Sequence, residues 1–178
     1  MEVCREVDQS VPIEGPRALE GLRSEPIPEE AWRTGCKWPV STRIATDASW
    51  QSGLYTVRVR DRNREVRSYF VVGPGRIPAR VLVLLPTHTE AAYNGWGGGS
   101  FYSRSQSTEV SFLRPISGSG QGPYASSIHL VRWLSREGIA FDVATDDELH
   151  DTPEILLQYP GIIIPGHSEY WSRSMRRG

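Results

Sequence analysis

The stretch Gly161–Trp171 reads GIIIPGHSEYW, and it decides the fold that we predict for this chain. Its run of isoleucines is β-branched and free of polar residues, which is typical of a strand buried on both faces of a parallel sheet. Pro165 and Gly166 end the strand, and the polar and aromatic residues that follow are His167, Ser168, Glu169, Tyr170 and Trp171. Because open α/β sheets bind ligands at the carboxyl ends of their strands, we expect a functional site just after Gly166.

Upstream of this stretch, apolar strands alternate with amphipathic helices. The predicted strands are 80–85, 139–145 and the isoleucine run, and the predicted helices are 126–137, 152–159 and a last one capped by Ser172. Asp146, Asp147 and Glu148 are expected to form a turn. This order of elements predicts a doubly wound α/β fold with an incomplete parallel sheet and right-handed crossovers.

The first part of the chain has a different texture. Leu54–Arg60 and Glu65–Val72 both alternate apolar and polar residues, which predicts an antiparallel hairpin. Trp38–Ile44 is expected to belong with these strands, and Gly73–Gly75 is a linker signal. We therefore divide the chain into a coil-like lead-in at 1–37, a β-rich segment at 38–75 that ends a β-sandwich-like domain, and an α/β unit at 76–178.

The composition excludes several classes of protein. The chain has 178 residues, is 38% hydrophobic and carries a net charge of −1, so we expect a globular protein with no affinity for nucleic acid or anionic membranes. No apolar run is long enough to span a bilayer, and no signal peptide is visible, so the predicted location is the cytoplasm. Cys4 and Cys36 are too few and too isolated for a disulfide framework or a zinc site.

Two loops follow strands of the predicted parallel sheet. They are Thr87–Tyr102 (THTEAAYNGWGGGSFY) and Gly166–Trp171. Because the carboxyl ends of parallel strands share one edge of a sheet, we expect the two loops to meet in space. The whole glycine-rich segment from Thr87 to Tyr124 is too long for an idle loop, so we expect it to be functional. Gly97–Gly99 lets its backbone come close to a ligand or to a neighbouring strand.

Within the second loop, His167 and Glu169 are two residues apart, so their side chains point the same way if the backbone is extended. Such a pair suits a metal ion, and it equally suits acid/base catalysis with the glutamate orienting the histidine. The alternative is a solvated loop whose histidine caps the following helix.

Aromatic residues crowd the first loop, and a tyrosine phenolate is a hard oxygen ligand suited to ferric iron. The residues that could wall a dry pocket are Tyr93, Trp96, Phe101 and Tyr102. The alternative is that these rings pack a surface loop onto the sheet. His88 and Glu90 are expected to be solvated, His129 to lie on a polar helix face, and Arg114 to anchor the long loop.

Other chemistries lack their motifs. No serine or cysteine has a GxSxG nucleophile elbow around it. The run Gly97–Gly99 is not a GxGxxG fingerprint and has no Walker lysine, which argues against a nucleotide site of flavodoxin type.

A series of motifs resembles the large (β) subunit of N,N-dimethylformamidase and its relatives, from about Trp38 to the end of the chain. The motifs are WQSGLY at 50–55, TEAAYN at 89–94 with GGGSFY at 97–102, VSFLRP at 110–115, VRWL at 131–134 and GHSEYW at 166–171. The resemblance implies a flavodoxin-like or glutamine-amidotransferase-like α/β fold preceded by a β-rich domain. It also implies an amidohydrolase that uses a mononuclear iron (Fe3+) to hydrolyse a small amide.

In that family the iron is held by two tyrosines and one glutamate. By motif, the metal ligands here would be Glu169, Tyr93 and Tyr124, with Tyr102 as the rival to Tyr124. His167 would act in catalysis beside the glutamate or near the substrate. The expected partners are the amide substrate and either further copies of the chain or a small subunit.

The resemblance also sets an alternative. The family continues into another strand with an asparagine-bearing loop and into further catalytic residues, including a carboxylate, so we expect this chain to be truncated and to lack its general base. The competing hypothesis is a non-catalytic, truncated or degenerate homologue that acts as a scaffold or ligand-binding module.

Overall fold

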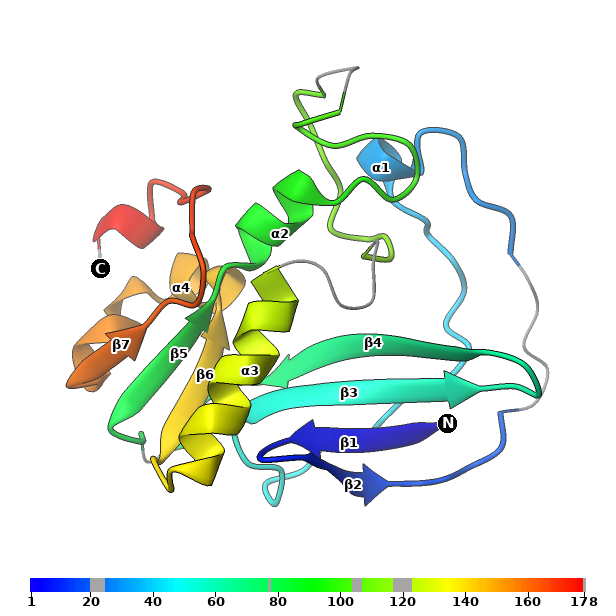
Figure 1. The fold of residues 1–178 in the computed structure, drawn as a ribbon. Coiled ribbons are helices and arrows are strands. Elements are labelled where there is room, and N and C mark those ends of the chain that lie inside the picture. Colours follow the sequence, from blue (N-terminus) through cyan, green and yellow to red (C-terminus); the bar gives the residue numbers. More distant parts are fainter. Residues whose placement is uncertain (20–24, 77, 104–106, 117–122, 178) are drawn as a thin grey trace.

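A computed structural model shows two β-sheets with helices packed against them (Figure 1). The structure describes residues 1–19, 25–76, 78–103, 107–116 and 123–177, without the side chains of 123–126. The four-stranded antiparallel sheet has the order β2-β1-β3-β4, and the three-stranded parallel sheet has the order β6-β5-β7. The strands are β1 Glu2–Glu6, β2 Ser10–Glu14, β3 Gly53–Arg60, β4 Glu65–Val72, β5 Val81–Leu85, β6 Phe141–Thr145 and β7 Gly161–Ile163. The helices are α1 Ala31–Thr34, α2 Thr87–Tyr93, α3 Pro123–Arg136, α4 Asp146–Asp151, η1 Pro153–Gln158 and η2 Met175–Arg177, of which η1 and η2 are 3-10 helices.

The antiparallel sheet corrects our expectation of a coil-like lead-in. β1 pairs with β2 on one side and with β3 on the other. The predicted hairpin of β3 and β4 is confirmed, with Gly53 opposite Val72 and Arg60 opposite Glu65. Trp38–Ile44, which we expected in this sheet, contains no strand and is mostly exposed. The β-rich part of the chain is therefore built from strands that begin at residue 2.

β5 is the central strand of the parallel sheet, with β6 and β7 beside it. Alternate residues of β5 pack into two different apolar cores, one on each face of the sheet. Leu82 and Leu84 pack with α4, η1 and η2 on one face, whereas Val83 and Leu85 pack with α3 and the start of β3 on the other. β5 is thus buried on both faces.

β7 lies at the edge of this sheet, which corrects our expectation for the isoleucine run. Ile163 packs against the core that contains α3, but Ile162 remains 41% exposed and Ile164 is also exposed. Among the described strands, β7 pairs with β5 alone. An apolar run predicts a strand in a sheet but does not determine how many neighbours that strand has.

Two helices occupy segments that we predicted as irregular. α2 begins immediately after Pro86, inside the segment expected to be a loop. α4 replaces the turn predicted at Asp146–Glu148, because Thr145 and Glu148 form a capping box at its start. α3 confirms the predicted helix but begins earlier, and its Trp133 is exposed instead of facing the core.

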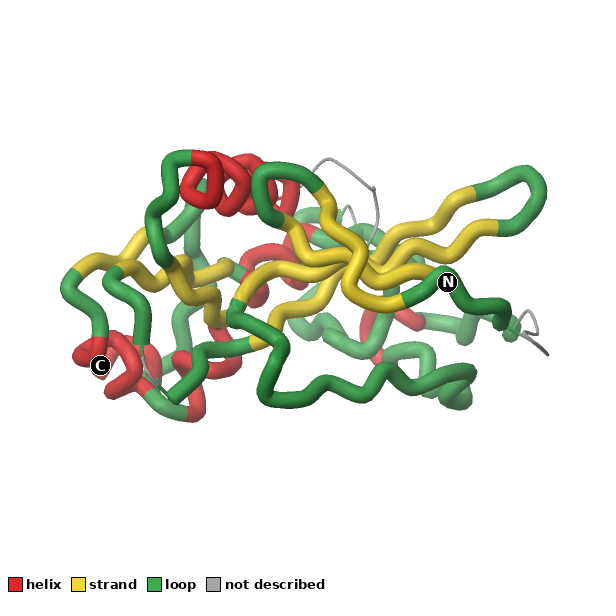
Figure 2. Tube along the Cα trace, turned by 90° about the horizontal axis from the view of Figure 1, so that it is seen from below, coloured by secondary structure: helices red, strands yellow, loops and turns green. Residues whose placement is uncertain are grey.

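The antiparallel sheet packs directly against the parallel one. Leu54 of β3 belongs to the same apolar core as Val83, Val131 and Val143. The Val143 amide donates to Ser52 Oγ at 2.9 Å, just before β3 begins. Figure 2 shows the strands of the two sheets meeting in the middle of the molecule, with the chain termini near opposite ends.

The parallel sheet has a switch point between β5 and β7. The connection from β5 to β6 runs through α3 on one face, and the connection from β6 to β7 runs through α4 and η1 on the other. The crevice outside the carboxyl ends of two such strands is the usual ligand site of an open α/β sheet. Among the described residues, no helix is long and apolar enough to cross a membrane.

Candidate functional site

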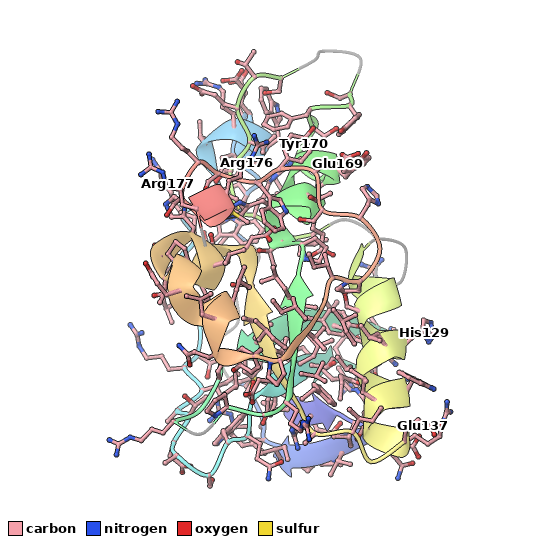
Figure 3. The ribbon with its side chains drawn as sticks, turned by 90° about the vertical axis from the view of Figure 1, so that its left-hand side faces the viewer. His129, Glu137, Glu169, Tyr170, Arg176 and Arg177 are labelled. Atoms are coloured by element: carbon pink, nitrogen blue, oxygen red, sulfur yellow. The ribbon has the colours of Figure 1, made fainter. Side chains whose placement is uncertain are left out.

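The loops that follow β5 and β7 meet at the side chain of Glu169, as we predicted. The hydroxyls of Tyr93 and Tyr102 each donate to Glu169 Oε2 at 3.0 Å. The two phenol rings stack with their centroids 4.1 Å apart. The Tyr102 and Tyr170 hydroxyl oxygens are 2.8 Å apart, and either can be the donor. We call Tyr93, Tyr102, Glu169 and Tyr170 the oxygen cluster, and Figure 3 shows its Glu169 and Tyr170 on the loop above the parallel sheet.

His167 lies beside this cluster. Its Nε2 atom is 3.9 Å from Glu169 Oε1, and the His167 side chain is 58% exposed. The edge of the imidazole faces the Tyr93 ring at a centroid distance of 5.6 Å. The His167 and Glu169 side chains therefore lie near each other, as their spacing predicted, and the imidazole is more than half exposed.

Within the oxygen cluster, the Tyr102 phenol holds its proton tightly. The hydrogen bonds of Tyr102 with Tyr170 and Tyr93, its partial desolvation, and the bond to Glu169 and its charge all raise the Tyr102 pKa. Ionisation of this phenol would place a second negative charge next to the Glu169 carboxylate. A cation bound among these oxygens would reverse that preference, because phenolate and carboxylate are ligands of hard cations.

These donors fit ferric iron better than they fit zinc. Within the described part of the chain, no three side chains of histidine, cysteine, aspartate or glutamate gather as a metal site. A metal ion bound at Glu169 would draw on the neighbouring tyrosine oxygens, and anionic oxygens suit a hard trivalent ion. The oxygens of Tyr93, Tyr102 and Glu169 are already within hydrogen-bond distance of one another.

Helix α2 holds the loop that carries Glu169. The Glu169 amide donates to Thr89 Oγ1 at 2.9 Å, and the His88 ring lies 3.3 Å from the Tyr170 carbonyl oxygen. The expectation that His88 and Glu90 are solvated is therefore wrong: the His88 side chain is only 16% exposed, and Glu90 is buried. Both residues face the interior because α2 forms where we predicted a loop.

The carboxylate of Asp146 fixes the start of α2. Its Oδ2 atom accepts from the His88 amide at 2.9 Å, and its Oδ1 atom is buried with no hydrogen-bond partner among the described residues. Burial raises the Asp146 pKa, and the hydrogen bond from the His88 amide only partly offsets this effect. Asp147 contacts the ring of the same residue, with Oδ1 3.0 Å from His88 Nε2.

The glycine-rich run approaches α1. A side chain at Gly99 would meet the Trp32 ring at 2.7 Å, and one at Gly97 would meet the Trp32 amide nitrogen at 3.0 Å. Arg114 anchors this loop as predicted, donating to the carbonyl oxygens of Trp96 and Gly99 at 2.5 and 3.0 Å. The glycines of this run thus serve packing between loop and helix.

The predicted aromatic wall is only partly assembled. Tyr93 and Tyr102 stack on each other, and Phe101 packs on Tyr170 at 5.5 Å. Trp96 instead contacts Trp38 edge-on at 5.9 Å. The side chain of Tyr124, our predicted second tyrosine ligand, lies outside the described residues. Sequence reasoning missed Tyr170 and Thr89, although both lie inside the quoted motifs.

The comparisons with known proteins agree with the motifs. A family model described as N,N-dimethylformamidase beta subunit-like, C-terminal, matches residues 6–178. A search of curated proteins found no match. Because the family model covers nearly the whole chain, this chain belongs to the N,N-dimethylformamidase beta subunit-like, C-terminal family.

Proposed function

We propose that this chain supplies the iron-binding part of an amidohydrolase that cleaves the C–N bond of a small amide. The observation that carries the proposal is the convergence of two phenols on the Glu169 carboxylate at 3.0 Å, in a chain of the N,N-dimethylformamidase beta subunit-like family. The residues proposed to hold iron are Tyr93, Glu169 and a second tyrosine. The geometry favours Tyr102 for that place, and the motif comparison favours Tyr124.

The residues around the oxygen cluster have separable roles in this proposal. Ferric iron, when bound, is a Lewis acid that polarises an amide carbonyl. His167 presents Nε2 at the edge of the cluster, where it is available to accept or donate a proton at the substrate. The stacked rings of Tyr93 and Tyr102 form an apolar wall against which small N-alkyl groups can pack.

We also infer that the parallel sheet is of the glutamine-amidotransferase-like or flavodoxin-like type. In chain order the three strands are arranged second, first, third, and sheets of flavodoxin type begin with that order. The oxygen cluster lies at the switch point of this arrangement, between the segments that follow β5 and β7. The family description names a beta subunit, which supports assembly with a different subunit.

Metal analysis with an optical spectrum tests the iron site. The purified chain is reconstituted with ferric iron and compared with Tyr93→Phe, Tyr102→Phe, Tyr124→Phe and Glu169→Ala. We expect near-stoichiometric iron and a phenolate-to-iron charge-transfer band in the wild type, both lost in Tyr93→Phe and Glu169→Ala. Of the other two variants, the one that loses the band identifies the second tyrosine ligand.

Tyr55→Phe is the matched control. The Tyr55 hydroxyl donates to the Gln51 carbonyl oxygen at 2.8 Å in the antiparallel sheet, so its loss removes a phenol without touching the oxygen cluster. This variant should keep iron and band. A well-folded wild type that takes up no iron would overturn the proposal and favour a non-catalytic family member.

A further inference from the structure

The backbone of Glu169 is held by a single buried side chain on a different element of the fold. Thr89 is fully buried on α2, and its Oγ1 atom accepts the Glu169 amide proton at 2.9 Å. The two residues are 80 positions apart in the chain. Glu169 itself has a side chain that is 43% exposed, so contacts with the surrounding core do not fix its position.

A second contact holds the next residue of the same loop. The His88 imidazole lies 3.3 Å from the Tyr170 carbonyl oxygen, 3.0 Å from Asp147 Oδ1 and against the Phe112 ring. The loop is thus attached to the first turn of α2 at two successive residues. Because α2 also carries Tyr93, the helix sets the distance between the Tyr93 phenol and the Glu169 carboxylate.

Helix α2 is in turn fixed to the sheet. It follows β5 directly, and Pro86 at its N-cap makes no side-chain cap. The missing acceptor comes from Asp146, whose carboxylate binds the His88 amide at 2.9 Å. A chain of contacts therefore runs from the carboxyl end of β6 through α2 to the backbone of Glu169.

We propose that Thr89 is a positioning residue that sets Glu169 for metal binding, with His88 as its auxiliary. The metal part of this proposal rests on the proposed function, whereas the holding of the loop does not. Residues that hydrogen-bond to metal ligands fix their orientation, and losing one commonly costs ten-fold or more in metal affinity. Thr89 would act in this way through the backbone of the ligand.

A pair of substitutions separates the hydroxyl of Thr89 from its bulk. Thr89→Val keeps the shape of the side chain and removes the acceptor. Thr89→Ser keeps the acceptor and removes a methyl group. If Thr89 acts by its hydrogen bond, Thr89→Val should disturb the Glu169 backbone more than Thr89→Ser does. If Thr89 acts by packing, Thr89→Ser should disturb it more.

The first measurement is amide hydrogen exchange of Glu169 by NMR in the metal-free protein. We expect exchange to accelerate about ten-fold in Thr89→Val and to stay near the wild-type rate in Thr89→Ser. The Val143 amide, which donates to Ser52 Oγ at 2.9 Å, is a matched internal control and should not change. His88→Ala should accelerate Glu169 exchange by about three-fold, and it provides a second test if a Thr89 variant fails to fold.

The second measurement is ferric-iron affinity. Thr89→Val should weaken binding about ten-fold, and Thr89→Ser should remain within about three-fold of the wild type. Unchanged Glu169 exchange in Thr89→Val, or equal damage by serine and valine, would overturn the positioning role. If Glu169 exchange accelerates in Thr89→Val and not in Thr89→Ser, but neither the wild type nor any variant binds iron, then Thr89 positions the loop. In that case the proposed function is the part that fails.

Discussion

The glutamates Glu6 and Glu169 each accept several hydrogen bonds, but their donors differ in kind. Glu6 of β1 is only 3% exposed, and it accepts from Thr56, Ser10 and the Arg132 guanidinium, the last at 2.6 Å. Glu169 is 43% exposed and accepts from two phenols. Among the described ion pairs, the one that includes Glu169 is with His167 at 3.9 Å.

The difference separates a buried carboxylate that joins parts of the fold from one that is open to solvent. The charge of Glu6 is balanced by an arginine that joins β1 to α3, so this group links the antiparallel sheet to the α/β part. The Glu169 carboxylate faces two phenol hydroxyls and, at 3.9 Å, the His167 imidazole. Under the proposed function a cation would take the place of the phenol protons, whereas Glu6 already has a guanidinium as its partner.

The largest expected effect on stability is that of Glu6→Ala. It leaves the Arg132 guanidinium and the Thr56 hydroxyl without their acceptor, so the free energy of unfolding should fall by about 2–3 kcal/mol. Urea denaturation measures the change. Glu137→Ala is the control, since Glu137 is exposed at the end of α3 and should change stability by less than about 0.5 kcal/mol. A loss below about 1 kcal/mol at Glu6 would contradict the structural role.

The pH dependence of the free energy of unfolding should also reveal the contribution of Glu6. Burial alone would raise the Glu6 pKa, but hydrogen bonds from Thr56, Arg132 and Ser10 outweigh it and hold the pKa below its usual value of 4.5. Glu6 therefore contributes stability above its unfolded pKa, and this contribution is lost as the pH falls through the folded pKa. Between about pH 5 and pH 3, the wild type should lose about 1 kcal/mol more than Glu6→Gln. If the free energies of unfolding of the wild type and Glu6→Gln fell in parallel with pH, this prediction would be contradicted.

Asp146 should behave in the opposite way. Burial raises its pKa, so the folded state binds this proton more tightly than the unfolded state and the ionised form costs stability at higher pH. Asp146→Asn removes that cost and should raise the free energy of unfolding at pH 8 by up to about 1 kcal/mol relative to the wild type. The advantage should shrink on acidification and disappear below the unfolded-state pKa, at about pH 4. If the stability advantage of Asp146→Asn grew on acidification, the Asp146 pKa would be lowered in the folded state and not raised.

The meeting of the two loops could be predicted from the sequence, because it depends only on short apolar strands followed by polar motifs. Parallel strands share one edge, so Tyr93 and Glu169 had to approach each other once β5 and β7 were recognised. The edge position of β7 could not be predicted, because the isoleucine run has the same sequence whether one strand or two pair with its backbone. The capping box of Thr145 and Glu148 was visible as T-x-x-E and was overlooked.

β1 and β2 were missed for a different reason. Their sequences EVCRE and SVPIE contain charged residues and a proline, so local periodicity is weak. What stabilises β1 is pairing with β3, more than 45 residues later in the chain, together with the ion pair of Glu6 with Arg132. Contacts of that range leave no local pattern. Thr89 escaped notice likewise, because its partner is the backbone of Glu169.

The smallest expected effect on stability is that of Glu169→Gln, and it completes the comparison. The amide keeps one carbonyl oxygen for the two phenols and removes an exposed charge, so the free energy of unfolding should change by less than about 0.5 kcal/mol in urea denaturation. Ferric-iron affinity should nevertheless fall by at least about ten-fold, because a neutral amide is a poor ligand for a hard trivalent cation. Glu6→Gln should do the reverse, lowering stability and sparing iron. A Glu169→Gln variant that loses as much stability as Glu6→Gln would mean that both carboxylates serve the fold.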